Sequence, residues 1–126
     1  PGYIQEGALF ALSLGSSFEE QIGAPFCRRR QIALDILREF PAVRAIDPKG
    51  AMYLMVDIRA TGLSGDAFAN RLLDERQIAV MPGESFGASA AGYLRIAMTI
   101  DDDRFASALK TLCEFATQLA SELTHG

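Results

Sequence analysis

Apolar residues recur every three or four positions along the last part of the chain, which is the spacing of one face of an α-helix. Asp101 starts this predicted helix, and its stripe consists of Phe105, Leu109, Leu112, Ala116, Leu119 and Leu123. A similar stripe predicts a long helix that ends near Phe40. Ser17 and Glu20 form a capping-box pattern at its start, and we expect Pro25 to kink or restart it. Shorter patterns predict a helix that closes at Gly15 and another that Ser64 caps, with Phe68, Leu72 and Leu73 as its apolar side.

Between these helices the pattern changes to alternation, the signature of strands. From Ala51 to Ile58 one face carries Met52, Leu54, Val56 and Ile58, and the other carries Tyr53, Met55 and Asp57. Further strands are predicted over residues 43–46, 78–81 and 93–98, and the turn at residues 47–50 makes the first two strands a hairpin. We therefore expect a two-layer α+β domain of the α/β class, with a small, mainly antiparallel sheet covered mainly on one side by helices.

Arg95 breaks the apolar pattern of the last predicted strand. Leu94, Ile96 and Met98 share one face of this strand, whereas Tyr93 and Arg95 lie on the other. A guanidinium group is always charged and carries a planar set of donors, so its place in a sheet is costly unless a carboxylate or phosphate meets it. The alternation thus predicts an exposed sheet face whose main feature is an arginine in need of an anionic partner.

Composition narrows the class of protein. The chain has 126 residues, enough for one globular core, and its net charge of -4 disfavours a nucleic-acid-binding or acidic-membrane-binding surface. We expect no membrane span, because no run of about 18 apolar residues occurs, and we expect a cytoplasmic protein. Cys27 and Cys113 are far apart in sequence, so we interpret them as buried, reduced thiols and predict no metal site.

Two motifs suggest other chemistry but fit it poorly. Residues 83–87 satisfy the G-x-S-x-G pattern of α/β-hydrolases, and aspartates and His125 follow in the appropriate order. The next element is a strand, however, whereas a nucleophile elbow must lead directly into a helix. Asp101, Asp102 and Asp103 resemble a hard-metal site, but three adjacent carboxylates at a helix start diverge and are better explained as caps.

A family resemblance lies in an ordered series of segments. These are Pro48-Lys49-Gly50-Ala51-Met52-Tyr53, the helix over residues 64–76, Ile78-Ala79-Val80-Met81-Pro82-Gly83, Phe86-Gly87 and Gly92-Tyr93-Leu94-Arg95-Ile96. In this order they resemble the C-terminal small domain of class I/II aminotransferases, enzymes of the aspartate aminotransferase fold family (fold type I) that use pyridoxal phosphate. The resemblance covers nearly the whole chain. It implies connecting helices over residues 1–40 and a small domain over residues 41–126.

The resemblance also implies roles for four residues. Arg95 would bind the α-carboxylate of the amino-acid substrate, because a guanidinium can grip both carboxylate oxygens and fix the orientation of the substrate. Gly50 and Tyr53 would lie in a turn near the substrate mouth, and Phe86 in the turn that leads to Arg95. The substrates would be an L-amino acid and a 2-oxo acid, and relatives of this fold are usually homodimers.

One departure from the family pattern limits what the chain can do alone. The family holds its cofactor on a lysine in a serine-lysine segment, and nothing here matches that segment. The only lysines are Lys49, in a turn, and Lys110, off the apolar stripe of the last helix. We therefore expect a fragment that lacks the large domain, contains no catalytic or cofactor-binding residue and is inactive alone. A free-standing module that binds small carboxylates or a protein partner remains an alternative, as does a lyase or a regulator of the same fold.

Overall fold

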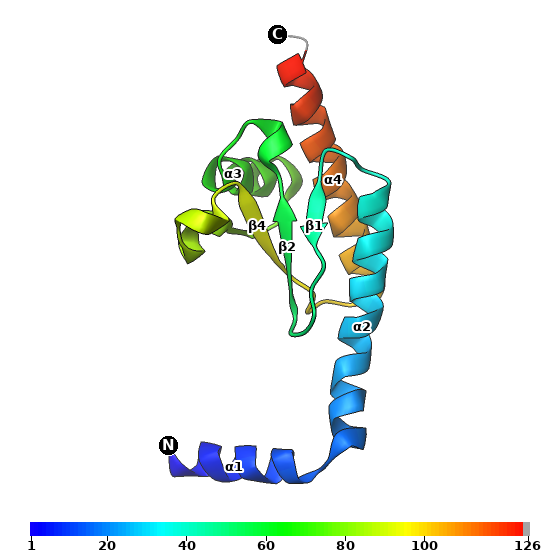
Figure 1. Cartoon of the computed structure of the whole chain (residues 1–126), viewed down its shortest axis with the longest axis vertical. Helices are drawn as coiled ribbons and strands as arrows, with labels where there is room; N and C mark the ends of the chain where they lie inside the picture. Colours follow the sequence, from blue (N-terminus) through cyan, green and yellow to red (C-terminus); the bar gives the residue numbers. More distant parts are fainter. Residues whose placement is uncertain (125–126) are drawn as a thin grey trace.

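A computed structural model describes residues 1–124, so His125 lies outside the described residues. Figure 1 shows a small sheet with helices packed against it, and a long N-terminal helical arm that extends away from it. The helices and strands, in chain order, are α1 (Gly2–Ser13), α2 (Ser16–Arg38), β1 (Arg44–Ile46), β2 (Tyr53–Asp57), α3 (Gly65–Arg76), β3 (Met81–Pro82), β4 (Tyr93–Ala97) and α4 (Asp102–Thr124). Three 3₁₀ helices lie between them: η1 (Arg59–Thr61), η2 (Gly83–Phe86) and η3 (Ala88–Ala90).

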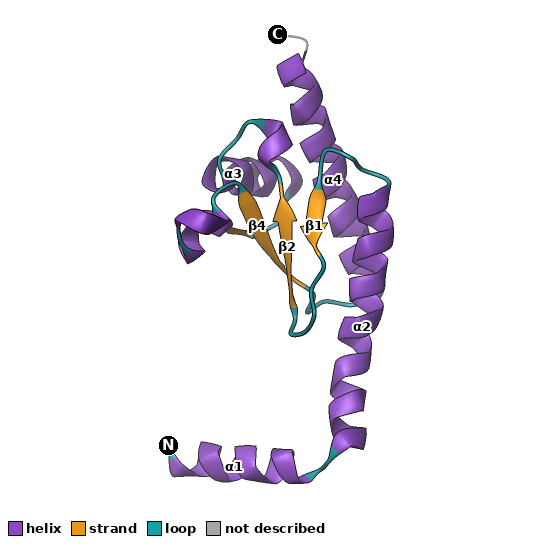
Figure 2. Ribbon diagram, in the orientation of Figure 1, coloured by secondary structure: helices purple, strands orange, loops and turns teal. Residues whose placement is uncertain are grey.

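The strands form a single sheet with the order β1-β2-β4-β3, and all three neighbouring pairs are antiparallel. The central pair sets the two faces of the sheet, because Leu54 lies opposite Ile96 while Met55 lies opposite Arg95. The predicted fold class, a small antiparallel sheet with helices, is confirmed, and the hairpin of β1 and β2 is present (Figure 2).

One face of the sheet forms the core with the helices. Leu54, Val56 and Leu94 are fully buried against it, as the alternation predicts. From α4 the stripe contributes Phe105, Leu109, Leu112, Ala116 and Leu119, whereas Leu123, in its last turn, is 58% exposed. Phe68 of α3 meets Phe115 of α4 edge to face, with 5.5 Å between ring centroids. The helices therefore cover the apolar sheet face and leave the face of Arg95 to other partners.

The N-terminal arm, defined here as α1 and the first turns of α2 up to Cys27, packs little against this core. α1 has no buried residue, and Tyr3, Phe10 and Leu12 are among its exposed apolar side chains. In Figure 1 α1, in dark blue, lies well apart from the sheet. α2 enters the core in its second half, through Ala33, Ile36 and Leu37, and Phe26 at the end of the arm packs partly buried against the core.

Several details of the two long helices differ from the predictions. α2 continues through Pro25, so of the two predicted alternatives, a kink or a restart, the restart is excluded. The capping box at Ser17 is wrong, because Gly15 occupies the cap position and no side chain caps the helix. At α3 the prediction is confirmed, since the hydroxyl of Ser64 accepts a hydrogen bond from the Ala67 amide at 3.2 Å.

Three burial predictions and one strand boundary are also wrong. Met52 is exposed because it precedes β2 in the hairpin loop. Leu73 was expected on the buried side of α3 but is exposed, whereas Leu72 is buried. Cys27 is exposed because it lies on the part of α2 that extends beyond the sheet, whereas Cys113 is buried as predicted. β3 contains only Met81–Pro82, since the preceding residues 78–80 have no ladder partner.

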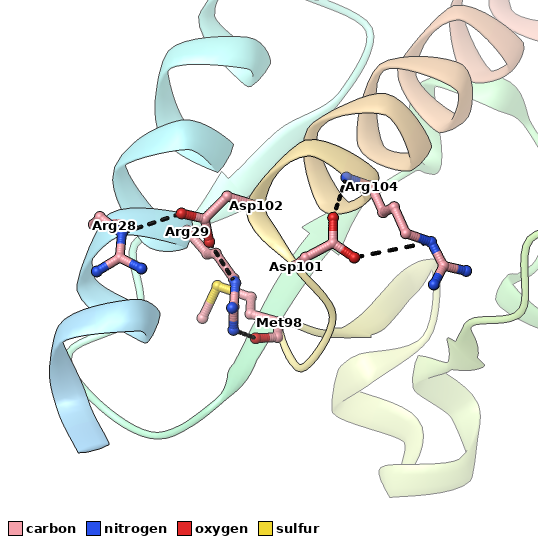
Figure 3. Close-up of polar contacts among 6 residues, drawn as sticks. All are labelled: Arg28, Arg29, Met98, Asp101, Asp102 and Arg104. Atoms are coloured by element: carbon pink, nitrogen blue, oxygen red, sulfur yellow. Dashed lines mark hydrogen bonds and ion pairs between the residues drawn. The ribbon is translucent and has the colours of Figure 1, made fainter. Parts of the chain in front are cut away.

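A polar cluster joins α2 to the start of α4 and to the end of β4 (Figure 3). Arg29 donates from Nε to Oδ1 of Asp102 at 2.8 Å and from Nη1 to the carbonyl oxygen of Met98 at 3.0 Å. Arg28 donates to the other carboxylate oxygen of Asp102 at 3.1 Å. Asp101 accepts a hydrogen bond from the Arg104 amide at 2.9 Å and so caps α4. These aspartates thus cap a helix and pair with arginines.

Candidate functional site: an arginine between two aromatic rings

Arg95 lies in the middle of β4 on the sheet face that the helices leave uncovered. Its side chain extends over two aromatic rings from different elements: Cζ lies 4.1 Å from the ring centroid of Tyr53 in β2 and 4.2 Å from that of Phe86 at the end of η2. Both distances are well within the range of cation–π interaction. The sheet register and the turn before β4 therefore bring together three of the four predicted site residues.

The guanidinium group of Arg95 has no polar partner within residues 1–124. Neither a hydrogen bond nor an ion pair joins its nitrogen atoms to any of these residues. Aromatic rings contact a guanidinium through its flat faces, while its N–H donors point outward in the plane of the group. The two rings can therefore orient the group and leave its donors available to an anion.

Arg59 provides a contrast on the same face. It forms an ion pair with Asp57, with 2.6 Å between Nη2 and Oδ2, and its Cζ lies 5.2 Å from the ring centroid of Tyr93. Hydrogen bonds from Arg59 lower the pKa of Asp57 despite its partial burial, and this carboxylate satisfies the guanidinium. Arg95 has similar aromatic contacts but, within residues 1–124, no such carboxylate.

A small hollow of about 160 Å³ opens beside Arg95. Its lining is Tyr53, Ala79, Val80, Met81, Arg95 and Ala97. Met81 pairs directly with Arg95 across the β3–β4 ladder, and the lining side chains other than Arg95 and Tyr53 are apolar. This arrangement suits a small molecule with a carboxylate at one end.

Gly50 lies in a different place from the other predicted site residues. It lines a larger cavity of about 730 Å³ between the N-terminal arm and the β1–β2 loop, together with residues such as Phe26, Cys27 and Met52. The structure therefore places Gly50 apart from the hollow beside Arg95.

Glu84 is a residue of the site region that the sequence patterns did not single out. Its Oε1 accepts hydrogen bonds from the amides of Gly65 at 2.9 Å and Gly92 at 3.2 Å. Its own backbone N–H group, and then those two amides, stabilise the ionised form and lower the pKa of Glu84. The available signal was an acidic residue inside a glycine-rich turn, a position where backbone donors often lack partners.

Neither of the two lysines is buried in the described structure. Lys49 forms an ion pair with Asp47 and its side chain is 84% exposed, and Lys110 is exposed on α4. Neither has the desolvated surroundings that make an amine reactive near neutral pH. Within residues 1–124 no three His, Cys, Asp or Glu side chains gather in a way that could hold a metal ion. Over the same residues, no helix combines the length and apolarity that a bilayer crossing requires.

Comparison with known proteins gives a consistent family. The family model for aminotransferase class I and II matches residues 4–112. An arginine–pyruvate transaminase of Pseudomonas aeruginosa is 37% identical over 97% of this chain, and an aspartate aminotransferase of Pyrococcus horikoshii is 29% identical over 87% of it. The chain spans only 31% and 29% of the length of these two relatives.

Solved structures agree with the sequence relatives. The structure of an aromatic aminotransferase from Pyrococcus horikoshii superimposes with a TM-score of 0.73 and 30% identity, and covers 79% of this chain and 26% of its own. The family implies dependence on pyridoxal phosphate and substrates that are amino and oxo acids. On the breadth of the family match and this structural similarity, the chain belongs to the class I and II aminotransferases.

Proposed function

We propose that this chain is the substrate-carboxylate-binding part of a pyridoxal-phosphate aminotransferase that moves an amino group from an L-amino acid to a 2-oxo acid. In this proposal Arg95 binds the substrate α-carboxylate, and Tyr53 and Phe86 hold its guanidinium group. The observation that carries the proposal is a half-buried arginine whose guanidinium group contacts two rings and has no polar partner within residues 1–124.

The chemistry of the guanidinium group supports this role. Two parallel N–H···O bonds to one carboxylate fix both the position and the rotation of the bound acid, which a lysine ammonium cannot do. Aminotransfer requires such control, because the bond that breaks at the substrate α-carbon must be held in a defined orientation to the cofactor. Contact with two rings limits the rotamers of Arg95 before the substrate arrives and so reduces the entropy lost on binding.

In this proposal, cofactor binding and catalysis belong to other parts of a longer protein. The chain spans 31% and 29% of the length of two relatives, which supports a part of a longer protein. The family resemblance implies that this is the C-terminal part, with connecting helices over residues 1–40 and a small domain over residues 41–126. The cofactor-binding lysine and the large domain would lie in the remaining part, and this chain alone would be inactive. On the family resemblance alone, we extend the proposal to a cytoplasmic homodimer in which Gly50 lies near the substrate mouth.

The relatives support the substrate class but no individual substrate. Their names include an arginine–pyruvate transaminase and an aspartate aminotransferase, whose amino-acid side chains have opposite charges. The feature that these substrates share is the α-carboxylate next to an amino or oxo group. Recognition by Arg95 therefore fits the whole class.

Substitution of Arg95 in the full-length enzyme tests the proposal. Arg95→Lys keeps the charge but loses the paired hydrogen bonds, so we expect kcat/KM to fall roughly 10- to 150-fold. Arg104→Lys is the matched control, because Arg104 has a side chain that is 78% exposed and belongs to α4. An Arg95→Lys enzyme as efficient as the control would refute the role of Arg95.

The isolated chain offers a second test, which concerns the cofactor. When it is mixed with pyridoxal phosphate and reduced with borohydride, we expect only the slow, unselective labelling typical of exposed lysines. Mass spectrometry would count and locate the adducts. Rapid stoichiometric labelling of Lys49 or Lys110 would contradict the assignment of the cofactor site to another part of the enzyme.

A further inference from the structure

The carboxylate of Glu84 ties together three segments: its own turn η2, the start of α3 and the residue before β4. Glu84 belongs to η2, and its Oε1 accepts hydrogen bonds from Gly65 at the start of α3 and from Gly92, the residue before β4. η2 ends at Phe86, two residues after Glu84, and Arg95 follows three residues after Gly92. One side chain therefore links the segment that carries the aromatic ring to the strand that carries the guanidinium.

The backbone fits closely around this carboxylate. A Cβ atom added at Gly65 would overlap Oε2 of Glu84 and lie 2.9 Å from the carbonyl oxygen of Tyr93. A Cβ added at Gly83 would overlap the carbonyl oxygen of Ala90 and lie 2.7 Å from that of Tyr93. Glycine at both positions thus allows η2, α3 and the start of β4 to approach one another around Glu84.

The second oxygen of Glu84 is poorly satisfied. Oε2 is buried and accepts no hydrogen bond from residues 1–124. Leaving a buried acceptor without a partner is costly, and such groups in native structures call for an explanation. The other oxygen, Oε1, offsets this cost by fixing the positions of two separate backbone segments at once. Its hydrogen bonds are strong because the acceptor is ionised.

The position of the Phe86 ring depends on the hydrogen bonds of Glu84 more than the position of the Tyr53 ring does. The Phe86 side chain is 46% exposed and it sits in a short 3₁₀ turn, whereas Tyr53 is held by the ladder between β2 and β4. η2 also packs against η3, α3 and β4, and the two hydrogen bonds of Glu84 add to these contacts that keep the Phe86 ring 4.2 Å from Cζ of Arg95.

We propose that Glu84 is a positioning residue that holds Phe86 against the guanidinium of Arg95 and thereby sets the affinity of Arg95 for the substrate carboxylate. This inference rests on the proposed role of Arg95. It assigns to Glu84 no contact with substrate and no proton transfer. Its effect is geometric, and the charge of Glu84 by itself would act in the opposite direction, since a nearby anion weakens the binding of another anion.

Three substitutions at Glu84 separate geometry from charge in the full-length enzyme. Glu84→Gln keeps an oxygen acceptor at the same distance, so KM for the amino acid should stay within about twofold of the parent value. Glu84→Asp keeps the charge but is one methylene too short to reach both amides, and Glu84→Ala removes the acceptor. For both we expect KM to rise about 3- to 30-fold, the range for loss of one cation–π contact, with kcat nearly unchanged.

Ser85→Ala is the matched control, because Ser85 is an exposed neighbour in the same turn. We expect this variant to behave like the parent enzyme. Thermal unfolding of every variant would show whether a change in KM merely follows a loss of stability. If Glu84→Ala does not fold, the comparison of Glu84→Asp with Glu84→Gln remains decisive.

Phe86→Leu tests whether Glu84 acts through the ring. This variant should raise KM to a similar extent, and Glu84→Asp should add little in the Phe86→Leu background because both changes break the same contact. Equal KM values for Glu84→Asp and the parent, or a rise in KM for Glu84→Gln as large as that for Glu84→Asp, would overturn the inference. Arg95→Lys in the same assay separates the two proposals: if it alone impairs the enzyme, Arg95 keeps its role and only the inference about Glu84 fails.

Discussion

The N-terminal arm and the sheet-and-helix body use apolar residues in opposite ways. In the body, apolar side chains at helical and strand spacing meet one another, and Phe68, Leu54 and Leu94 are completely buried. In α1, the first helix of the arm, apolar side chains stay exposed, with Tyr3 at 76% and Leu12 at 73%. A helical pattern therefore identifies a helix in both regions but indicates its partner only in the body.

This difference separates two sources of helix stability. A helix of 12 residues such as α1 is marginal by itself in water, because nucleation is costly and most helical stability in proteins comes from tertiary packing. α4 has that packing along one full stripe, whereas α1 has none within the described part of the chain. Four predictions test this comparison.

The largest expected difference is in the reaction rate of the two cysteines. Cys113 is fully buried, and burial together with the nearby Glu114 raises the pKa of its thiol to about 12. Cys27 is exposed on the arm. Because the thiolate is the reactive form, a thiol-specific disulfide reagent at pH 8 should label Cys27 at least about 10³-fold faster than Cys113, which must wait for unfolding.

The control for this experiment is Cys27→Ser, which should remove the fast phase and leave the slow one. Labelling in denaturant should make both thiols of the parent chain react quickly. Two fast thiols in the native chain would mean that the core around α4 opens readily.

The second largest difference should be in the stability lost when one phenylalanine in each region is truncated to alanine. Phe115→Ala should lower the free energy of unfolding by about 3–5 kcal/mol, because it leaves a cavity beside Phe68. Phe10→Ala, on the arm, makes the same chemical change at a side chain that is 67% exposed, so we expect a change within about 0.5 kcal/mol. Urea unfolding of the 126-residue chain measures both. Comparable losses would show that α1 is packed in solution.

A smaller difference in stability is expected between substitutions of Arg28 and Arg29, two neighbouring arginines at the boundary between arm and body. The Arg29 side chain is 14% exposed and bonds both Asp102 and the Met98 carbonyl, so Arg29→Met should cost about 1.5–3 kcal/mol. Arg28 shares the same carboxylate but is 59% exposed, and Arg28→Met should cost less than about 1 kcal/mol. Urea midpoints compare them, and an equal cost would show that burial of the Arg29 contacts does not matter.

The smallest effect concerns the starts of α2 and α3. Ser64→Ala should lower the free energy of unfolding by about 1 kcal/mol, since it removes the hydrogen bond from the Ala67 amide. Ser17→Ala in the arm should have almost no effect, because no side chain caps α2. Thermal or urea unfolding distinguishes these outcomes. A clear loss for Ser17→Ala would restore the capping box that the sequence pattern predicts.

Local patterns predicted the body well and its details less well. The alternation around Leu54 and Leu94 correctly separated the core face from the face of Arg95, because successive strand residues must point to opposite sides. Boundaries were less accurate, as the short β3 shows, because a strand ends where its ladder partner ends and not where its apolar run does. Burial of Cys27 was predicted wrongly, since no local pattern reports how far a helix extends beyond the sheet.

The candidate site shows the same division. The sequence singled out Arg95, Tyr53 and Phe86 through an anomalous charge and an ordered series of motifs, and the structure brings these three side chains together. It did not single out Glu84, because the amides that this carboxylate meets belong to residues 19 positions earlier and 8 positions later in the chain. Whether the three side chains bind a substrate is for the Arg95→Lys experiment to decide.

The sequence by itself determined the helices, the strands, the two faces of the sheet and the family, because these depend on periodicity and on motifs that are local in the chain. Only the tertiary structure decided which apolar stripes find partners, how Arg95 is held between two rings without a carboxylate in residues 1–124, and why Glu84 stands in its turn. The physical reason is distance along the chain. Contacts between residues far apart in sequence arise from packing and strand register, which no short window of sequence encodes.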